Sequence, residues 1–132
     1  IEHDFKDFPH CALKICVQTE DKTLAAAIAQ TVPHCHAILF SDVPWHSLAP
    51  STATKEAATR RLSQELSIPL EHIMAFGDDF NDLGLISTVG YGIAMGNAIP
   101  EIKAAAKDIT GTNNQDGVAH YLEQVLQLQG NR

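Results

Sequence analysis

The sequence predicts an α/β protein with parallel strands. Strand and helix signals alternate along its 132 residues, which is the pattern of a parallel sheet connected by helices. A loop rich in aspartate directly follows an apolar run that reads as a buried strand, and such strand ends form the binding crevices of open α/β sheets. Hydrophobic residues make up 45% and charged residues 19% of the chain, as in soluble globular domains.

The N-terminal elements are short. Residues 12–17 are mostly apolar and predict a strand, after which Asp21 is expected to cap a helix with apolar residues at spacings of three and four. Residues 37–40 predict a second strand, and residues 43–48 either continue it or pair with it. Pro44 argues against a central strand there, because proline has no N–H to donate to a neighbouring strand.

The rest of the chain repeats the alternation after a boundary near residues 50–52. Strands are expected at residues 73–76, 92–95 and 108–110, and helices at residues 55–66, 82–89 and 100–106 and near the C-terminal end. Pro100 followed by Glu101 is typical of a first helical turn. The apolar run that ends at Gly77 predicts a strand buried on both faces.

Charge and composition exclude several classes of protein. The net charge is -7 and the nine Lys and Arg residues form no cluster, which argues against a nucleic-acid or anionic-membrane surface. No apolar run reaches the ~18 residues of a membrane helix, and no signal peptide is visible. Cys11, Cys16 and Cys35 are expected to be free thiols in the cytoplasm. Because the sequence begins at Ile1 rather than Met, we expect a piece of a longer protein.

The aspartate-rich loop is the most informative stretch. Asp78, Asp79 and Asp82 lie within five positions of one another. Their charges repel, and a bound hard cation such as Mg²⁺ would relieve this repulsion with the oxygen ligands that it prefers. The alternative is a solvated turn that caps the next helix, where negative charge is also favourable. Composition alone leaves both interpretations open.

A specific resemblance comes from four stretches taken in order. They are Gly-Asp-Asp-Phe-Asn-Asp at 77–82, Gly-Ile-Ala-Met-Gly-Asn-Ala at 92–98, Pro-Glu-Ile-Lys at 100–103 and Thr-Asn-Asn-Gln-Asp-Gly-Val-Ala at 112–119. This order resembles the haloacid dehalogenase (HAD) superfamily and its Cof-type sugar-phosphate phosphatase branch. Lys55, which lies 23 residues before Asp78, fits the spacing of that branch. The resemblance covers about residues 55–122, the C-terminal part of such a phosphatase.

The resemblance implies Mg²⁺-dependent hydrolysis of small phosphate esters through an aspartyl-phosphate. It makes Asp78 a metal ligand, and it places Asn81 on the substrate phosphate or beside the groups that bind it. Asp82 would position metal-bound water and the lysine. Lys55 would bind the transferring phosphoryl group, a role that also suits its place at a predicted helix start. Asp79 falls on a variable position of the motif, and a solvated side chain is expected there.

The resemblance also implies a domain organisation. Residues 51–132 would form the C-terminal half of a HAD-like core, a partial Rossmann-like parallel sheet with helices on both faces. Residues 1–50 would be the remnant of an α/β cap that selects the substrate. The motif Asp-x-Asp-Gly-Thr, which carries the nucleophile in this superfamily, does not occur in the sequence. We therefore expect the chain alone to be inactive, and to self-associate or pair with a missing N-terminal segment through the exposed edge of the strand at 73–76.

Two other functions remain as alternatives. The first is a truncated, non-catalytic module that binds a metal or a partner. The second is the phosphorylation domain of a cation-pumping ATPase, which the lack of a membrane segment and the stretch at 112–119 disfavour. Asn97 and Asn113 are given structural roles in turns, and Asp116 is expected to cap the last helix. His34 and His36 share one face of an extended segment, but without further ligands zinc is not expected.

Overall fold

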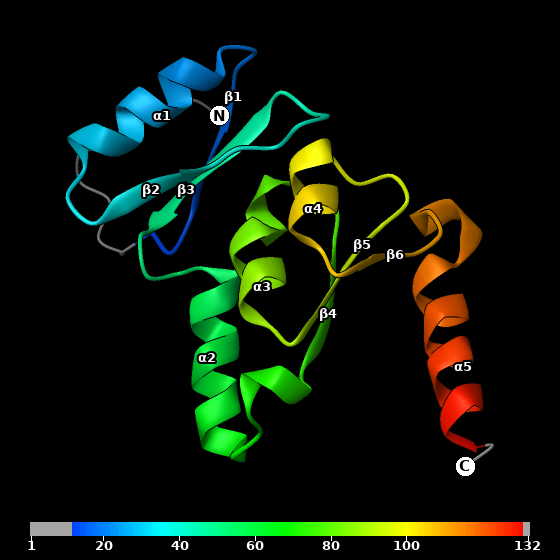
Figure 1. Cartoon of the computed structure of the whole chain (residues 1–132). Coiled ribbons are helices and arrows are strands. Elements are labelled where there is room, and N and C mark those ends of the chain that lie inside the picture. Colours follow the sequence, from blue (N-terminus) through cyan, green and yellow to red (C-terminus); the bar gives the residue numbers. More distant parts are fainter. Residues whose placement is uncertain (1–11, 131–132) are drawn as a thin grey trace.

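The computed structural model describes the backbone of residues 12–130 and the side chains of residues 12–127. The first 11 residues of the predicted cap remnant, including Cys11, lie outside this range. The described part contains two three-stranded sheets, each with its own helices (Figure 1). They lie on either side of residue 50, where the sequence predicts a domain boundary. The domain assignment itself remains a prediction.

The first sheet is antiparallel, with strands β1 (Ile15–Gln18), β2 (Cys35–Ile38) and β3 (Trp45–Pro50) in the order β1-β3-β2. Helix α1 (Lys22–Thr31) packs against it. The predicted cap of this helix is confirmed, because the side chain of Asp21 accepts hydrogen bonds from the amides of the first helical turn. Since α1 carries alanines on its buried face, the helix lies close to the sheet.

The expectation that Pro44 excludes a central strand is wrong. Strand β3 pairs with both of its neighbours, and it begins at Trp45, one residue after the proline. Pro44 therefore needs to donate no ladder hydrogen bond, while its carbonyl accepts one from the amide of Thr19 at 2.8 Å. The proline precedes the central strand without interrupting it.

The second sheet is parallel, and it confirms the predicted α/β class. Its strands are β4 (Met74–Gly77), β5 (Tyr91–Ala94) and β6 (Asp108–Ile109), in the order β4-β5-β6. The helices are α2 (Lys55–Leu66), α3 (Leu83–Thr88), α4 (Pro100–Ala105) and α5 (Gly117–Gly130), with 3₁₀ turns η1 (Leu70–His72), η2 (Phe80–Asp82) and η3 (Asn113–Gln115). Figure 1 shows α3 and α4 on one side of this sheet and α5 on the other.

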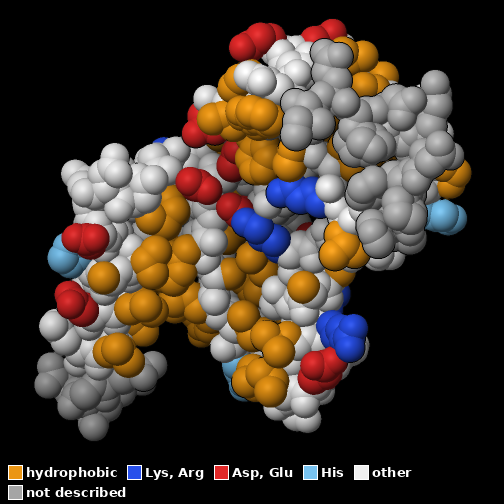
Figure 2. Space-filling view, turned by 180° about the vertical axis from the view of Figure 1, so that it is seen from behind, with side chains coloured by type: hydrophobic (Ala, Val, Ile, Leu, Met, Phe, Trp, Pro, Cys, Tyr) orange, Lys and Arg blue, Asp and Glu red, His pale blue; other side chains and the backbone are white. Residues whose placement is uncertain are grey.

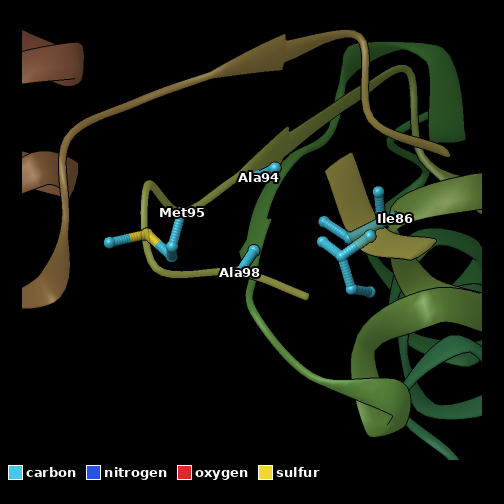
Figure 3. Close-up of a cluster of buried hydrophobic side chains, with 5 residues drawn as sticks. Ile86, Ala94, Met95 and Ala98 are labelled. Carbon is cyan, nitrogen blue, oxygen red and sulfur yellow. The ribbon is translucent and has the colours of Figure 1, made fainter. Parts of the chain in front are cut away.

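The core of the second sheet is a cluster of buried apolar side chains. It joins Ile86 of α3, Ala94 of β5, Ile102 of α4 and the turn residues Met95 and Ala98 (Figure 3). Complete burial of an isoleucine contributes about 1.5–3 kcal/mol. Because the cluster packs α3 and α4 against the sheet, it fixes the carboxyl end of β5 and the turn that follows.

Strand β4 forms an edge of this sheet. It pairs with β5 in the described part of the chain, and its first three residues are only half-buried, so the prediction of burial on both faces is wrong.

Helix α2 has the predicted apolar stripe, but Leu62 and Leu66 are 53% and 57% exposed. Figure 2 shows hydrophobic side chains gathered between α5 and the rest of the molecule. Among helices of residues 12–130, none is long and apolar enough to cross a membrane.

Tyr121 connects α5 to two strands of the sheet. Its ring packs edge-on against Phe76 of β4, with centroids 5.7 Å apart, and its hydroxyl donates a 3.0 Å hydrogen bond to Asp108 of β6. Partial burial raises the pKa of Tyr121 above its ordinary value of 10.0, and the hydrogen bond to Asp108 and the charge of that carboxylate raise it further. The neutral phenol is therefore the form that the fold favours.

A substitution at Tyr121 tests this connection. Because the pKa of Tyr121 is raised by folding, its contribution to stability is fully present below pH 10 and is lost at more alkaline pH. Tyr121→Phe should lower the free energy of unfolding at pH 7 by about 1 kcal/mol. Urea unfolding at pH 7 to 11 should show this difference shrinking above pH 10. A constant difference would contradict the proposed role of the hydroxyl.

Candidate active site

The aspartate-rich segment at residues 78–82, here called the acidic loop, begins at the carboxyl end of β4 and turns back over it. A Cβ atom on Gly77 would lie 2.5 Å from the Cβ of Asp82, so this close approach requires glycine at the end of the strand. The Gly77 carbonyl accepts a 2.9 Å hydrogen bond from the amide of Met95, which ties the start of the loop to the neighbouring strand end. The loop is thus held over the sheet.

Asp82 is the buried centre of the loop. Only 5% of the residue is exposed, and its two carboxylate oxygens have different partners. One accepts a hydrogen bond from the ammonium group of Lys55, and the other accepts a 3.1 Å bond from the amide of Asp78. Because a buried carboxylate is costly without such partners, this pairing fixes both the lysine and the loop.

Lys55 reaches the loop from the first turn of α2. Thr54 caps this helix by accepting a 3.2 Å bond from the amide of Ala57, which sets the start of the helix beside the acidic loop. The Lys55 side chain is 47% exposed, so its ammonium group faces both Asp82 and open space. The predicted proximity of Lys55 to the loop is therefore present in the structure.

The side chain of Asp78 has a contact that the sequence did not predict. Its Oδ2 atom accepts a 3.1 Å hydrogen bond from Nδ2 of Asn97, and Oδ1 of Asn97 accepts a 3.0 Å bond from the amide of Asn113. Asn97 therefore orients the Asp78 carboxylate while also bracing the η3 segment. Its position soon after β5 is a signal that could have identified it, because the ends of parallel strands meet at one edge of a sheet.

These groups line a common cavity of about 450 Å³, here called the acidic pocket. Its lining comprises Phe40, Ser41, Asp42, Lys55, Asp78, Asp79, Asn81, Asp82, Asn97 and Asn113. All four residues that the sequence analysis assigned to the site are among them. A cavity of this size accommodates a small metabolite.

Asp79 has more protein contacts than a freely solvated side chain would have. This residue is half-buried, and its Oδ1 atom accepts a 2.8 Å bond from the amide of Phe80. Its Oδ2 atom accepts a 3.0 Å bond from the amide of Ser41, in the loop between β2 and β3. The side chain therefore connects the two sheets, although 38 residues separate it from Ser41.

The three carboxylates of the acidic loop do not converge. Asp82 is directed to Lys55 and Asp79 to Ser41, and within residues 12–130 no group of three or more His, Cys, Asp or Glu side chains is arranged to hold a metal. Asp78, which the sequence analysis assigned to the metal, also lines the acidic pocket. Mg²⁺ in phosphoryl-transfer sites is held by one or two carboxylates together with waters and phosphate oxygens. Asp78 fits one position of such a site.

The fold and the pocket define an α/β protein with a polar site at the carboxyl ends of parallel strands, where a lysine and an aspartate face one small cavity. A profile of the haloacid dehalogenase-like hydrolases matches residues 1–122 of the chain. The chain therefore belongs to this family.

Known relatives agree with this assignment. The HMP-PP phosphatase of Yersinia enterocolitica is 37% identical over 118 residues, which cover 86% of the chain and 43% of that protein. The 5-amino-6-(5-phospho-D-ribitylamino)uracil phosphatase YitU of Bacillus subtilis is 39% identical over 87 residues, which cover 64% of the chain and 32% of that protein. The chain spans less than half the length of these curated relatives.

Solved structures show the same fold. A haloacid dehalogenase-like hydrolase from B. subtilis superposes with a TM-score of 0.71 at 33% identity, covering 84% of the chain and 40% of that protein. The protein SMU.1108c of Streptococcus mutans superposes with a TM-score of 0.83 at 25% identity, covering 93% of the chain and 48% of that protein.

A double-mutant cycle tests the pairing of Lys55 with Asp82. Replacing either residue, by Lys55→Met or Asp82→Asn, should destabilise the fold, and the two changes together should cost less than their sum by about 1 kcal/mol. Urea unfolding at low salt measures each free energy. The same cycle on Arg61 and Glu65, an exposed ion pair on α2, should give a coupling below about 0.5 kcal/mol. Equal couplings would show that the Asp82 site has no special stabilising role.

Proposed function

We propose that the chain forms the lysine and metal side of the active site of a Mg²⁺-dependent phosphatase in the cytoplasm. The whole protein would hydrolyse small phosphate esters, with sugar phosphates as the expected class, through an aspartyl-phosphate. The observation that carries this proposal is the arrangement of Lys55 and Asp78 on one pocket, linked through the buried Asp82. Two of the relatives are phosphatases named for phosphorylated small metabolites, which supports small phosphate esters as the substrate class.

Each side chain has a role that follows from its chemistry. Mg²⁺, when bound, would neutralise charge on the phosphoryl group, and Asp78 would be its ligand from this chain. The Lys55 ammonium would bind the transferring phosphoryl oxygens, since it faces the pocket and its orientation is fixed by Asp82. Asn81 would donate a hydrogen bond from its amide to the phosphate. Asp82 would hold Lys55 and the loop in place.

The nucleophile would come from a segment that this sequence does not contain. The chain has no Asp-x-Asp-Gly-Thr motif, and covalent catalysis requires the attacking group. Among residues 12–130, β4 pairs with β5 alone, and this supports a further strand at its other edge, because an edge of unpaired N–H and C=O groups pairs readily with another strand. We therefore propose that the chain is inactive alone, and that it self-associates or pairs with an N-terminal segment.

A second candidate is a non-catalytic module that binds a metal or a partner. The missing nucleophile motif favours it. The exposed apolar side chains of α2 would then belong to a partner interface. The two candidates share the metal site and differ in whether a segment with the nucleophile completes the pocket.

Metal binding can be measured on the chain itself. In thermal unfolding experiments, Mg²⁺ at ten times its dissociation constant should stabilise the native chain by about 1.4 kcal/mol. Asp78→Asn should abolish most of this shift, because it removes the carboxylate ligand. The matched control is Asp42→Asn, which removes one negative charge from the lining of the same pocket and should retain the shift. Equal shifts in the native chain and Asp78→Asn would refute the metal assignment.

Activity provides a separate test. The chain should not hydrolyse p-nitrophenyl phosphate above the rate of the buffer, with or without Mg²⁺, since it lacks the nucleophile motif. The measurement is the release of p-nitrophenol, with Lys55→Met as the control for contaminating phosphatases. Turnover by the native chain that Lys55→Met loses would show that a nucleophile is present after all.

A further inference from the structure

The loop at residues 39–44, between β2 and β3, is here called the cover loop. It contributes Phe40, Ser41 and Asp42 to the lining of the acidic pocket, whose remaining lining residues all follow residue 50. The loop is thus the part of the first sheet that borders the proposed phosphate site. The contacts that hold the cover loop in place therefore determine the shape of the pocket opening.

Four hydrogen bonds hold the cover loop. The amide of Phe40 donates to Nδ1 of His46 at 3.5 Å, Nζ of Lys22 donates to the Ser41 carbonyl at 3.4 Å, and the amide of Thr19 donates to the Pro44 carbonyl at 2.8 Å. All three of these partners lie in the first 50 residues. The fourth bond runs from the amide of Ser41 to Oδ2 of Asp79 at 3.0 Å, and it alone crosses to the acidic loop.

We propose that Asp79 is a positioning residue that ties the cover loop to the acidic loop and so sets how the cover loop closes the acidic pocket. That this pocket is the phosphate site rests on the function proposed above. The hydrogen bond from the Ser41 amide to Asp79, here called the tie, is a contact of the structure itself. It gives a role to a position at which the family motif specifies no residue type.

The chemistry of the tie favours a carboxylate. Asp79 uses its two oxygens on two amides, that of Phe80 in its own loop and that of Ser41 in the cover loop. An asparagine of the same shape has one acceptor oxygen and would leave one of the two amides without its partner. A hydrogen bond to an ionised acceptor is also stronger than one between neutral groups. Serine could still cap Phe80, but its short side chain would not reach Ser41.

The tie has a consequence for the substrate. With the Ser41 bond intact, Asp42 is part of the lining of the acidic pocket. A carboxylate at that place disfavours anionic leaving groups and favours those that offer hydroxyl or amine donors. When the bond breaks, the cover loop keeps only its bonds to partners in the first 50 residues, and the pocket opens on this side. Asp79 therefore acts on substrate access through the cover loop rather than by touching the substrate.

Amide hydrogen exchange on the metal-free, ¹⁵N-labelled chain tests the tie. In Asp79→Ser, exchange of the Ser41 amide should be about tenfold faster than in the native chain, as expected for the loss of one charge-assisted hydrogen bond. Exchange at Ile93, which is 1% exposed in β5, should stay within about twofold and show that the fold is intact.

Two matched variants separate the tie from other effects. Ser41→Ala keeps the backbone N–H, and Asp42→Asn removes a charge from the same pocket while leaving Asp79 in place. Both should leave exchange of the residue-41 amide within about twofold of the native rate. If Asp79→Ser does not fold, Asp79→Asn replaces it, and the amide of Ser41 or that of Phe80 should then exchange faster.

The proposal is overturned if Asp79→Ser leaves the Ser41 amide unchanged, or if Asp42→Asn accelerates it equally. Because these measurements use neither metal nor substrate, they are independent of the proposed phosphatase function. If Mg²⁺ does not stabilise the native chain but the Ser41 amide exchanges faster in Asp79→Ser, the proposed function is refuted and the tie is supported. If Mg²⁺ stabilises the native chain but exchange of the Ser41 amide is unchanged in Asp79→Ser, only the tie is refuted.

Discussion

The arrangement of the site depends on the buried carboxylate of Asp82. A charge with only 5% exposure is tolerated because an ammonium group and a backbone amide share it. The ammonium belongs to Lys55 at the start of α2, and the amide belongs to Asp78 at the end of β4. One side chain therefore links a helix that precedes the sheet to the loop that follows its first strand. Without this link, the lysine would have no side-chain contact that fixes it to the acidic loop.

This link also directs the other carboxylates. Asp82 pairs with Lys55, and Asp79 accepts a hydrogen bond from the cover loop. Asp78 is left at the pocket, where Asn97 restrains it from the turn after β5. Three adjacent acids thus serve three separate contacts. The sequence analysis assigned the metal to Asp78 alone, and this residue fits the chemistry of such an ion.

Features that depend on local sequence were predicted well. The cap at Asp21, helix α2 and the three short parallel strands follow from periodicity, capping residues and turn residues within a few positions. Contacts between distant segments were not predicted. Nothing near Asp79 in the sequence points to Ser41, and the bond from Asn97 to Asp78 spans 19 residues. The central place of β3 was missed because pairing order is a property of the whole sheet.

The edge of the second sheet and the acidic loop are connected geometrically. In the part of the chain that the structure describes, β4 is an edge strand, and the acidic loop is the continuation of that same strand. A further strand that paired with β4 in parallel would end beside Asp78, since the carboxyl ends of parallel strands meet at one edge. A side chain just beyond that end would face Asp78 and Lys55 across the acidic pocket. Covering the exposed edge and supplying a nucleophile would then be accomplished by one segment, which is why we expect stability and activity to be restored together.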